Sequence, residues 1–289
     1  APWWAVRGPG ARRMGPVGVA VALTVGHGTR GARLPPPAWT VPGNGLERWA
    51  GGQGANQAVA AAAAGGTVVM VGCVGSDEAG HAYAARLSAL GIDTAAVRVE
   101  PASLTGHAFI TVDEMGENSI VVVAGANAAL SLDDLAPLDS VGPGDVVLLQ
   151  LEVPLPVVAA AARRGAARGA RVILNLAPYA ALPADIVALA DPLVVNEHEA
   201  LMLADSESLP ASLVVTFGAA GAAWDGDQMT GPLLEGSDVL DTTGAGDAFC
   251  GTLSAALAAG RGRREALETA LAAGADAVRH LGAQPNPLL

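Results

Sequence analysis

The chain contains no lysine: its 16 basic residues are all arginine, they face 28 acidic residues, and the formal net charge is −12. Nucleic acids and anionic membranes need a basic surface, so this charge argues against a general binder of either. The familiar phosphate loop, whose lysine reaches the phosphates, is absent as well. An acidic protein can still bind ATP where backbone amides and a metal ion offset the phosphate charge.

Cysteines, aromatic residues and long apolar runs are also scarce. Cys73 and Cys250 are too few and too far apart for a disulfide framework or a thiolate metal site, so we expect a reducing, cytoplasmic location. No apolar run reaches the roughly 20 residues that cross a bilayer, and no membrane association is expected. Aromatic residues make up only 3% of a chain that is 51% hydrophobic, which suits helices packed closely on a sheet.

The first residues have an unusual composition. Arg12-Arg13 followed by MGPVGVAVALTV resembles a short export signal with paired arginines, but the apolar part is brief and no A-x-A cleavage site follows. We therefore interpret residues 17–25 as a buried first strand. Residues 1–16, rich in Gly, Pro and Arg, are expected to be a disordered extension, and residues 17–289 a single domain.

From residue 52 onward, apolar β-branched runs alternate with alanine-rich stretches. Helices are expected at residues 54–66, 77–91, 154–168, 183–190 and 197–204. Strands are expected at TVVMVGCVG (67–75) and at the short apolar runs DVVLLQ, RVILNL, PLVVN and SLVVTFG. Continuous apolar runs are typical of strands covered on both faces. The alternation predicts an α/β layered domain with a parallel sheet and right-handed crossovers.

One segment breaks this alternation. Residues 105–127 contain two strands with alternating patterning, joined by a turn near Met115-Gly116-Glu117, and no helix separates them. We expect these strands to form a small antiparallel flap beside the main sheet.

The segment DTTGAGDAFCG (241–251) places two aspartates around a glycine-rich turn. We expect SDVL before it to be a strand and DAFCGTLSAALAAG after it to be a helix. Gly244, Ala245 and Gly246 then lie at a helix amino terminus, where N–H groups lack partners and the dipole is positive. Asp247 would stand at the first helical position.

This arrangement suits transfer of a phosphoryl group from ATP to an alcohol. Amides stabilise the charge on the moving group, and the carboxylate of Asp247 accepts the hydroxyl proton, without a lysine. A simpler interpretation is that Asp247 only caps the helix.

Taken with its other motifs, the chain is identified as similar to the ribokinase-like (PfkB) carbohydrate kinases. DTTGAGDAFCG resembles the carboxy-terminal signature of that family, and GGQGANQAVAAA (51–62) resembles the amino-terminal one with one substitution. The resemblance covers about residues 33–289. Further segments follow in the family's order: GENSIVVVAGAN (116–127), LLQLEVP (148–154), NLAP (175–178), VVNEHEA (194–200), VVTFGAAGA (214–222) and GAQPNP (282–287).

The resemblance implies a three-layer α/β/α fold with a mostly parallel central sheet and a small antiparallel β lid, with lid strands from about 27–50 and 97–125. It implies phosphorylation of a sugar's primary hydroxyl, with D-ribose as the expected acceptor and ATP as the donor. Asp247 would be the general base, and the amides of 244–247 would form the anion hole. A homodimer formed through the lid is also implied.

The same resemblance supplies the binding residues. The expected sugar-binding residues are Gly52, Gln53, Asn56, Glu152 and Asp247. A carboxylate such as Glu152, just after an apolar strand, usually lies in the binding crevice of an α/β sheet, whereas Asn56 could also be an ordinary polar residue in a first helical turn. The expected nucleotide-binding residues are Asn196, Thr216, Gly218, Gly221 and Gly246.

Two cations are implied. Asn196 and Glu199 would hold Mg²⁺ through water, although their spacing is also that of a capping box, and both interpretations can hold together. Asp241, Thr243, Gly282 and Asn286 would surround an activating monovalent cation, usually K⁺.

The chain departs from the family at the expected sugar pocket. Thr24 and Gly26 stand where the first strand usually carries Asn and Asp, Ala38-Trp39 replaces Gly-Glu, and Gln53 replaces a lysine. A missing carboxylate costs charged hydrogen bonds of roughly 1.5–3 kcal/mol each. Three explanations are open: a different sugar or alcohol, a weakened or inactive enzyme, or residues 1–32 that derive from a misread start or a shifted frame.

Other functions remain as alternatives. Within the class, the acceptor could be another pentose, deoxyribose or a nucleoside. From a different class, the chain could be a catalytically silent sugar- or nucleotide-binding regulator. A dinucleotide-dependent oxidoreductase is disfavoured, because no G-x-G-x-x-G follows the first strand with an acidic residue about 20 positions later. The histidines and the scattered tryptophans indicate no metal site and no stacking platform.

Overall fold

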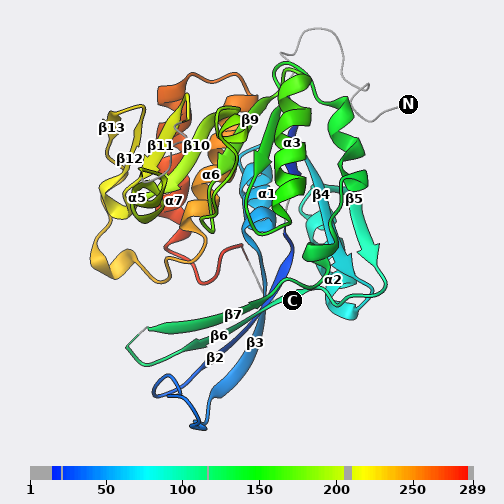
Figure 1. Cartoon of the computed structure of the whole chain (residues 1–289). Coiled ribbons are helices and arrows are strands. Elements are labelled where there is room, and N and C mark those ends of the chain that lie inside the picture. Colours follow the sequence, from blue (N-terminus) through cyan, green and yellow to red (C-terminus); the bar gives the residue numbers. More distant parts are fainter. Residues whose placement is uncertain (1–14, 21, 116, 205–209, 286–289) are drawn as a thin grey trace.

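A nine-stranded sheet forms the centre of the molecule in the computed structural model, which describes residues 15–20, 22–115, 117–204 and 210–285 (Figure 1). Its strand order is β13-β12-β11-β10-β9-β8-β1-β4-β5. The strands from β11 to β5 are parallel, and β12 and β13 are antiparallel. The mostly parallel sheet predicted from the alternating pattern is therefore confirmed. Its strands are β1 (Val17–Ala20), β4 (Val68–Gly75), β5 (Asp93–Glu100), β8 (Val146–Leu149), β9 (Arg171–Asn175), β10 (Ala190–Asn196), β11 (Leu213–Thr216), β12 (Ala222–Trp224) and β13 (Asp227–Met229).

Helices cover both faces of this sheet. The helices are α1 (Gln53–Ala63), α2 (Glu78–Ala89), α3 (Leu155–Ala167), α4 (Ala184–Val187), α5 (Glu197–Ala204), α6 (Ala245–Ala258) and α7 (Arg263–Ala277), with short 3₁₀ turns η2 (Gly125–Ala129), η3 (Asp133–Ser140), η4 (Gly218–Ala220) and η5 (Gly236–Asp238). Helices α1, α2, α6 and α7 pack in one apolar core, and α3, α4 and α5 pack in the other. The two cores make three layers, as predicted.

Strand β8 shows why continuous apolar runs belong here. Val146 and Leu148 point into one core, and Val147 and Leu149 point into the other. All of them are at most 1% exposed. Because side chains alternate along a strand, a strand covered on both faces needs an apolar residue at every position.

A second, four-stranded sheet, which we call the lid, projects away from the main body (Figure 1). Its order is β3-β2-β6-β7, with strands β2 (Thr24–Arg30), β3 (Asn44–Gly51), β6 (Gly106–Val112) and β7 (Asn118–Val123). The predicted pairing of two antiparallel strands within 105–127 is confirmed by β6 and β7. Strands β2 and β3 are also antiparallel, whereas the central pair β2 and β6 is parallel.

Three sequence predictions of local structure were wrong. Residues 17–25 belong to two strands and not one: β1 ends at Ala20, β2 begins at Thr24, and the side chain of Asn127 bonds both the N–H and the C=O of Leu23 before β2. SDVL (237–240) does not form a strand: residues 236–238 make η5, and the N–H of Leu240 donates to Val278 instead. The helix expected at 183–190 ends at Val187, since β10 begins at Ala190.

The amino-terminal extension lies largely outside the described residues, which begin at Gly15. Gly15 donates to the carbonyl of Ala258, and the carbonyl of Pro16 accepts from Val146. Among the helices of the described residues, none has the length and apolar character needed to cross a membrane.

Candidate active site

The glycine turn before α6 creates the amino terminus on which the site is built. Gly244 caps the helix with a left-handed backbone (φ 78°), and a Cβ on it would lie 2.5 Å from the Cβ of Ala283. Only glycine meets both requirements. The helix begins at Ala245, so Asp247 occupies its third position and not its first, since the turn closes at Gly244.

The first N–H groups of α6 are unequally available. The N–H of Ala245 donates to the carbonyl of Thr242 at 3.3 Å. Those of Gly246 and Asp247 have no acceptor among the described residues. Two adjacent amides at a positive helix end are suited to an anion.

Asp247 lies against α1. Its Oδ2 accepts a hydrogen bond from Asn56 Nδ2 at 2.8 Å, and its Oδ1 accepts one from Gln57 Nε2 at 2.9 Å. The residue is 9% exposed. Burial raises the pKa of Asp247 to about 7, against the opposing effect of the two hydrogen bonds and with a further contribution from the charge of Glu152. A carboxylate that titrates near neutral pH is well matched to accept a proton.

A group of buried amide side chains surrounds this carboxylate, and sequence reasoning did not assign it a role. Gln57 also contacts Asn175 and Gln150, while Asn56 accepts from Gln284, which in turn bonds Tyr83. Most of these residues lie within the motifs GANQ, LLQLE, NLAP and GAQP. A polar residue at the end of an apolar strand, such as Gln150, was the available signal.

Three expected sugar-binding residues meet where α1 begins. The backbone N–H of Gln53 donates to Glu152 Oε2 at 2.8 Å. Gly52 has a φ of 90°, and a Cβ there would lie 2.9 Å from Ala22 O and Thr24 N, so the backbones approach closely. Burial raises the pKa of Glu152, and the bond from Gln53 opposes this. The site therefore lies beside β1 and β8, where chain connections diverge across the sheet.

The lid strand β2 brings no carboxylate to this region at the expected position. A Cβ on Gly26 would lie 3.6 Å from Ile110 Cδ1 and 3.7 Å from Trp49 Cε3. The ring of Trp49 also covers Gly28, where a Cβ would lie 1.8 Å from Cζ3. An aromatic and an aliphatic side chain thus border the position at which the family has aspartate. Nothing in the sequence pattern singled out Trp49.

The expected nucleotide-binding residues follow two adjacent strands. Asn196 and Thr216 pair at the ends of β10 and β11. Asn196 Oδ1 accepts from the N–H of Glu199, and Glu199 Oε2 accepts from the N–H of Asn196, both at 2.8 Å. The capping box is therefore present. Burial raises the pKa of Glu199, against the bond from Asn196.

Asp241 ties together the two segments expected to surround a monovalent cation. Its Oδ1 accepts from the N–H of Thr243, and its Oδ2 accepts from the N–H of Gly282, both at 2.9 Å. Burial would raise the pKa of Asp241, but these hydrogen bonds outweigh it and lower the pKa. Asn286 lies outside the described residues. Within the described ranges, no three His, Cys, Asp or Glu side chains form a metal-binding cluster.

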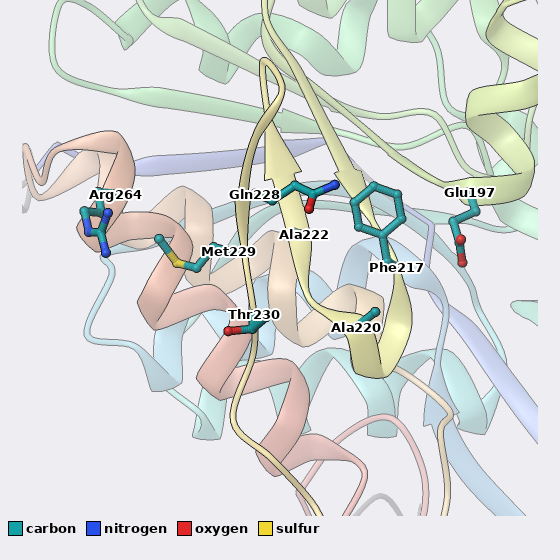
Figure 2. A pocket seen from close by; sticks show the side chains of 8 residues that line it. All are labelled: Glu197, Phe217, Ala220, Ala222, Gln228, Met229, Thr230 and Arg264. Carbon is teal, nitrogen blue, oxygen red and sulfur yellow. The ribbon is translucent and has the colours of Figure 1, made fainter.

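A pocket of about 440 Å³ lies next to the turn that carries Gly218 and Gly221 (Figure 2). Phe217 and Ala220 of that turn line it. A second hollow of about 520 Å³ lies between Arg30, Asn44 and Met115 in the lid. Asp247 lines neither of them. The first is lined by Glu197, Phe217, Ala220, Ala222, Gln228, Met229, Thr230 and Arg264.

Comparison with known proteins gives concordant matches. The model of the pfkB family of carbohydrate kinases matches residues 37–288. The ribokinase of Haemophilus influenzae is 35% identical over 269 residues, which cover 86% of this chain and 88% of the relative. The deoxyribokinase of Salmonella typhi is 35% identical over 220 residues, 70% of this chain and 72% of the relative. The structure of Arabidopsis thaliana ribokinase complexed with ribose and ATP is 28% identical, with a TM-score of 0.83 and coverage of 94% and 96%.

Proposed function

Because the chain belongs to the pfkB family of carbohydrate kinases, we propose that it transfers the γ-phosphoryl group of ATP to the primary hydroxyl of D-ribose, giving D-ribose 5-phosphate and ADP. The observation that carries this proposal is the buried carboxylate of Asp247, which has a pKa of about 7 and lies at the amino terminus of α6. The names of similar proteins, ribokinase and deoxyribokinase, support a pentose acceptor.

The proposed step needs a base and an anion hole. Asp247 takes the proton from the acceptor hydroxyl as its oxygen bonds to the γ-phosphorus, and the bond from that phosphorus to the bridging oxygen of ADP breaks. The N–H groups of Gly246 and Asp247 donate to the oxygens of the migrating group. Because α6 fixes these amides before the reaction, stabilising the charge requires little reorganisation.

The acceptor would bind at the start of α1. Gln53 Oε1 and Gln150 Oε1 are buried acceptors with no hydrogen-bond partner among the described residues. Hydroxyl groups are donors that such oxygens can use. Asn56 uses one hydrogen of its Nδ2 on Asp247 and keeps the other for a ligand, while Gly52 and Glu152 complete the proposed sugar contacts.

Cations would supply the remaining positive charge in a chain without lysine. Asn196 and Glu199 would hold Mg²⁺ through water, since only one carboxylate oxygen of Glu199 is used in the capping box. Asp241, Thr243 and Gly282 would contact K⁺ together with nearby backbone carbonyls; Asn286, also proposed, lies outside the described residues. Oxygen ligands of this kind fit Mg²⁺. Mg²⁺ would neutralise charge on the phosphates of ATP, and K⁺ would stabilise the segments around the anion hole.

The lid supports a homodimer. The hydrophobic residues of β7 are about half exposed: Ile120 51%, Val121 60%, Val122 60% and Val123 49%. Contiguous exposed apolar surface marks an interaction site, and an edge strand is a ready site for pairing. A second copy of the lid would cover it. A cytoplasmic location is also proposed, because Cys73 and Cys250 are both buried free thiols.

The test is an ATP-consumption screen over pentoses, 2-deoxyribose, hexoses and nucleosides, with and without K⁺. We expect the highest kcat/KM on ribose and a lower rate without K⁺. Asp247→Asn serves as the matched control and should lose roughly 10²–10⁴-fold in rate, because it removes a positioned base. Near-normal turnover in Asp247→Asn would contradict the proposed mechanism. If the protein binds ATP measurably but phosphorylates none of the alcohols, the result would instead support a catalytically silent regulator.

A different acceptor is the second candidate. Gly26 lies beside Trp49 and Ile110, and neither offers a hydrogen bond to a sugar hydroxyl equivalent to that of a carboxylate. An acceptor with fewer hydroxyls, such as deoxyribose, or with an apolar group, such as a nucleoside, suits this wall better. A kcat/KM on 2-deoxyribose or a nucleoside above that on ribose in the same screen would favour this candidate.

A further inference from the structure

We propose that two buried chains of hydrogen-bonded side chains position the carboxylate of Asp247, and that Gln57, Gln150 and Asn175 on one side and Gln284 and Tyr83 on the other are positioning residues. The inference rests on the proposed role of Asp247 as the base. Gln150 acts here through its Nε2, whereas its Oε1 is the atom offered to the acceptor; the other four residues have no proposed contact with the sugar or ATP.

Asp247 presents a problem of orientation to its neighbours. An ionised carboxylate can only accept hydrogen bonds, whereas the amide of Asn or Gln carries an acceptor at one end and a donor at the other. Asn56 and Gln57 must therefore both turn their NH₂ groups toward Asp247. A rotation of either amide by half a turn would place oxygen against oxygen. Something beyond these two residues has to prevent that rotation.

The first chain prevents it for Gln57. Asn175 Nδ2 donates to the backbone carbonyl of Val194 at 3.3 Å, and a carbonyl can only accept. Asn175 therefore presents Oδ1 to Gln57 Nε2, at 3.0 Å. On its other side, Gln57 Oε1 accepts from Gln150 Nε2. A reversed Gln57 would lose its bonds to Asn175 and Asp247 and would place its own oxygen against theirs.

The second chain does the same for Asn56. The hydroxyl of Tyr83 donates to the carbonyl of Gly51, so the oxygen of Tyr83 is left to accept from Gln284 Nε2, at 2.8 Å. The same Gln284 Nε2 donates to Asn56 Oδ1 at 2.9 Å. Arg86 Nε, which can only donate, approaches Gln284 Oε1 at 3.5 Å. Asn56 is thereby left with its NH₂ toward Asp247.

Burial makes the two chains effective. Gln57 and Tyr83 are 0% exposed, Gln150 1%, and Gln284 2%. Water cannot replace a lost partner in such surroundings, so each wrong orientation leaves an unpaired polar group. The members come from α1, α2, β9, the position directly after β8 and the segment after α7. Residues from distant parts of the chain thus converge on one carboxylate.

The charge state of Asp247 gives the chains a measurable consequence. The titratable groups that interact with it are Glu152, Tyr83 and Cys250. Burial and Glu152 favour the protonated acid, and the two N–H donors favour the carboxylate. Removal of a donor, or of the partner that orients it, should raise the pKa of Asp247 further.

The test titrates Asp247 directly in the full chain, by NMR of ¹³C-carboxyl-labelled aspartate, with the signal identified by its absence in Asp247→Asn. In Gln57→Leu we expect the midpoint to rise by about one pH unit, as loss of a charged hydrogen bond implies. Tyr83→Phe, which removes a single oxygen, should raise it by less. The acidic limb of the kcat/KM profile on the best acceptor should move by the same amounts.

The control is Ser254→Ala, which removes a buried hydrogen bond to the Cys250 carbonyl in the same helix but belongs to neither chain. It should leave the midpoint unchanged. If the Asp247 midpoint is unchanged in Gln57→Leu, the first chain does not position Asp247. If it is unchanged in Tyr83→Phe, the second chain does not. Both conclusions hold whatever the activity of Asp247→Asn. If the midpoints move but Asp247→Asn keeps full activity, the two chains do position Asp247, but Asp247 is not the base. If Gln57→Leu fails to fold, Gln150→Met takes its place with the same expected direction.

Discussion

Strands β8 and β7 have nearly the same kind of sequence and opposite environments. The four residues of β8, Val-Val-Leu-Leu, are at most 1% exposed, whereas Ile120–Val123 in β7 are between 49% and 60% exposed. Helix layers cover β8 on both faces, and β7 is an edge strand of the lid (Figure 1). An apolar run therefore indicates that a strand is to be shielded from water. It does not indicate whether helices of the same chain or another molecule shield it.

The two sheets also differ in what they can do for chemistry. The main sheet holds Gln150 and Asn175 at strand ends in a dense core, so the groups around Asp247 have few alternative positions. Strand β7 of the lid is exposed at every position, and regions with few buried apolar contacts open most easily. We therefore expect the main sheet to hold the groups around Asp247 in fixed positions, and the lid to be the part that changes its contacts.

The largest expected difference between the two strands is in stability. Leu148→Ala should lower the free energy of unfolding by about 2–5 kcal/mol, because it leaves a cavity between packed layers. Val121→Ala should change it by less than about 0.5 kcal/mol in dilute protein. Urea denaturation measures both. Equal losses for the two substitutions would show that β7 is covered in the isolated chain and would break the comparison.

A second effect concerns association. Val122→Glu should weaken the proposed lid-to-lid dimer at least tenfold in Kd, because a charge would be buried against apolar partners. Sedimentation velocity over a range of protein concentrations measures this. Leu201→Glu, at a residue 70% exposed on α5, is the control and should leave the dimer intact. A wild-type chain that sediments as a monomer at every concentration would remove the dimer from the proposal.

The smallest expected effect is a pH dependence confined to the lid. His27 Nε2 lies 2.9 Å from His107 Nδ1, and burial, then the charges of His107 and Arg48, lower the pKa of His27. The folded lid thus prefers neutral His27. Neutral His27 contributes fully to the stability of the folded lid at pH values above the pKa of an ordinary histidine, near 6.5. That contribution is lost as the pH falls from there through the lowered pKa of His27 in the folded lid.

Hydrogen exchange, corrected for intrinsic rates, should therefore show less amide protection in β2 and β6 at pH 5 than at pH 7. Protection in β8 should stay the same. In His27→Phe the pH dependence of the lid should disappear, since an uncharged ring remains beside Phe109, on which His27 stacks. If His27→Phe still loses amide protection at pH 5, the pH dependence of the lid arises from a titratable group other than His27.

Local pattern was sufficient for much of the fold. The apolar runs identified most of the parallel strands, although not β5, and the glycine turn located the start of α6 to within two residues. It was insufficient where distant residues decide the outcome. Leu23, just before β2, is bonded by Asn127, which lies 104 positions away. No periodicity within residues 17–25 contains that information.

The site shows the same limit. Sequence motifs pointed to Asn56 and Asp247 separately, and the structure joins them by a hydrogen bond. They did not point to Gln57 or Gln284, because amide residues are mostly exposed, nor to Tyr83, a lone aromatic residue in a predicted helix. Burial alone distinguishes these residues, and burial depends on the whole fold.

The long-range hydrogen bonds of Asn56 bear on how the protein is made. Asn56 bonds Asp247 and Gln284, which lie 191 and 228 positions further along the chain. During synthesis, the residues of α1 leave the ribosome long before these partners exist. The nascent polypeptide therefore carries unpaired amides at the start of α1 until translation has passed residue 284, and only then can the phosphoryl-transfer centre assemble.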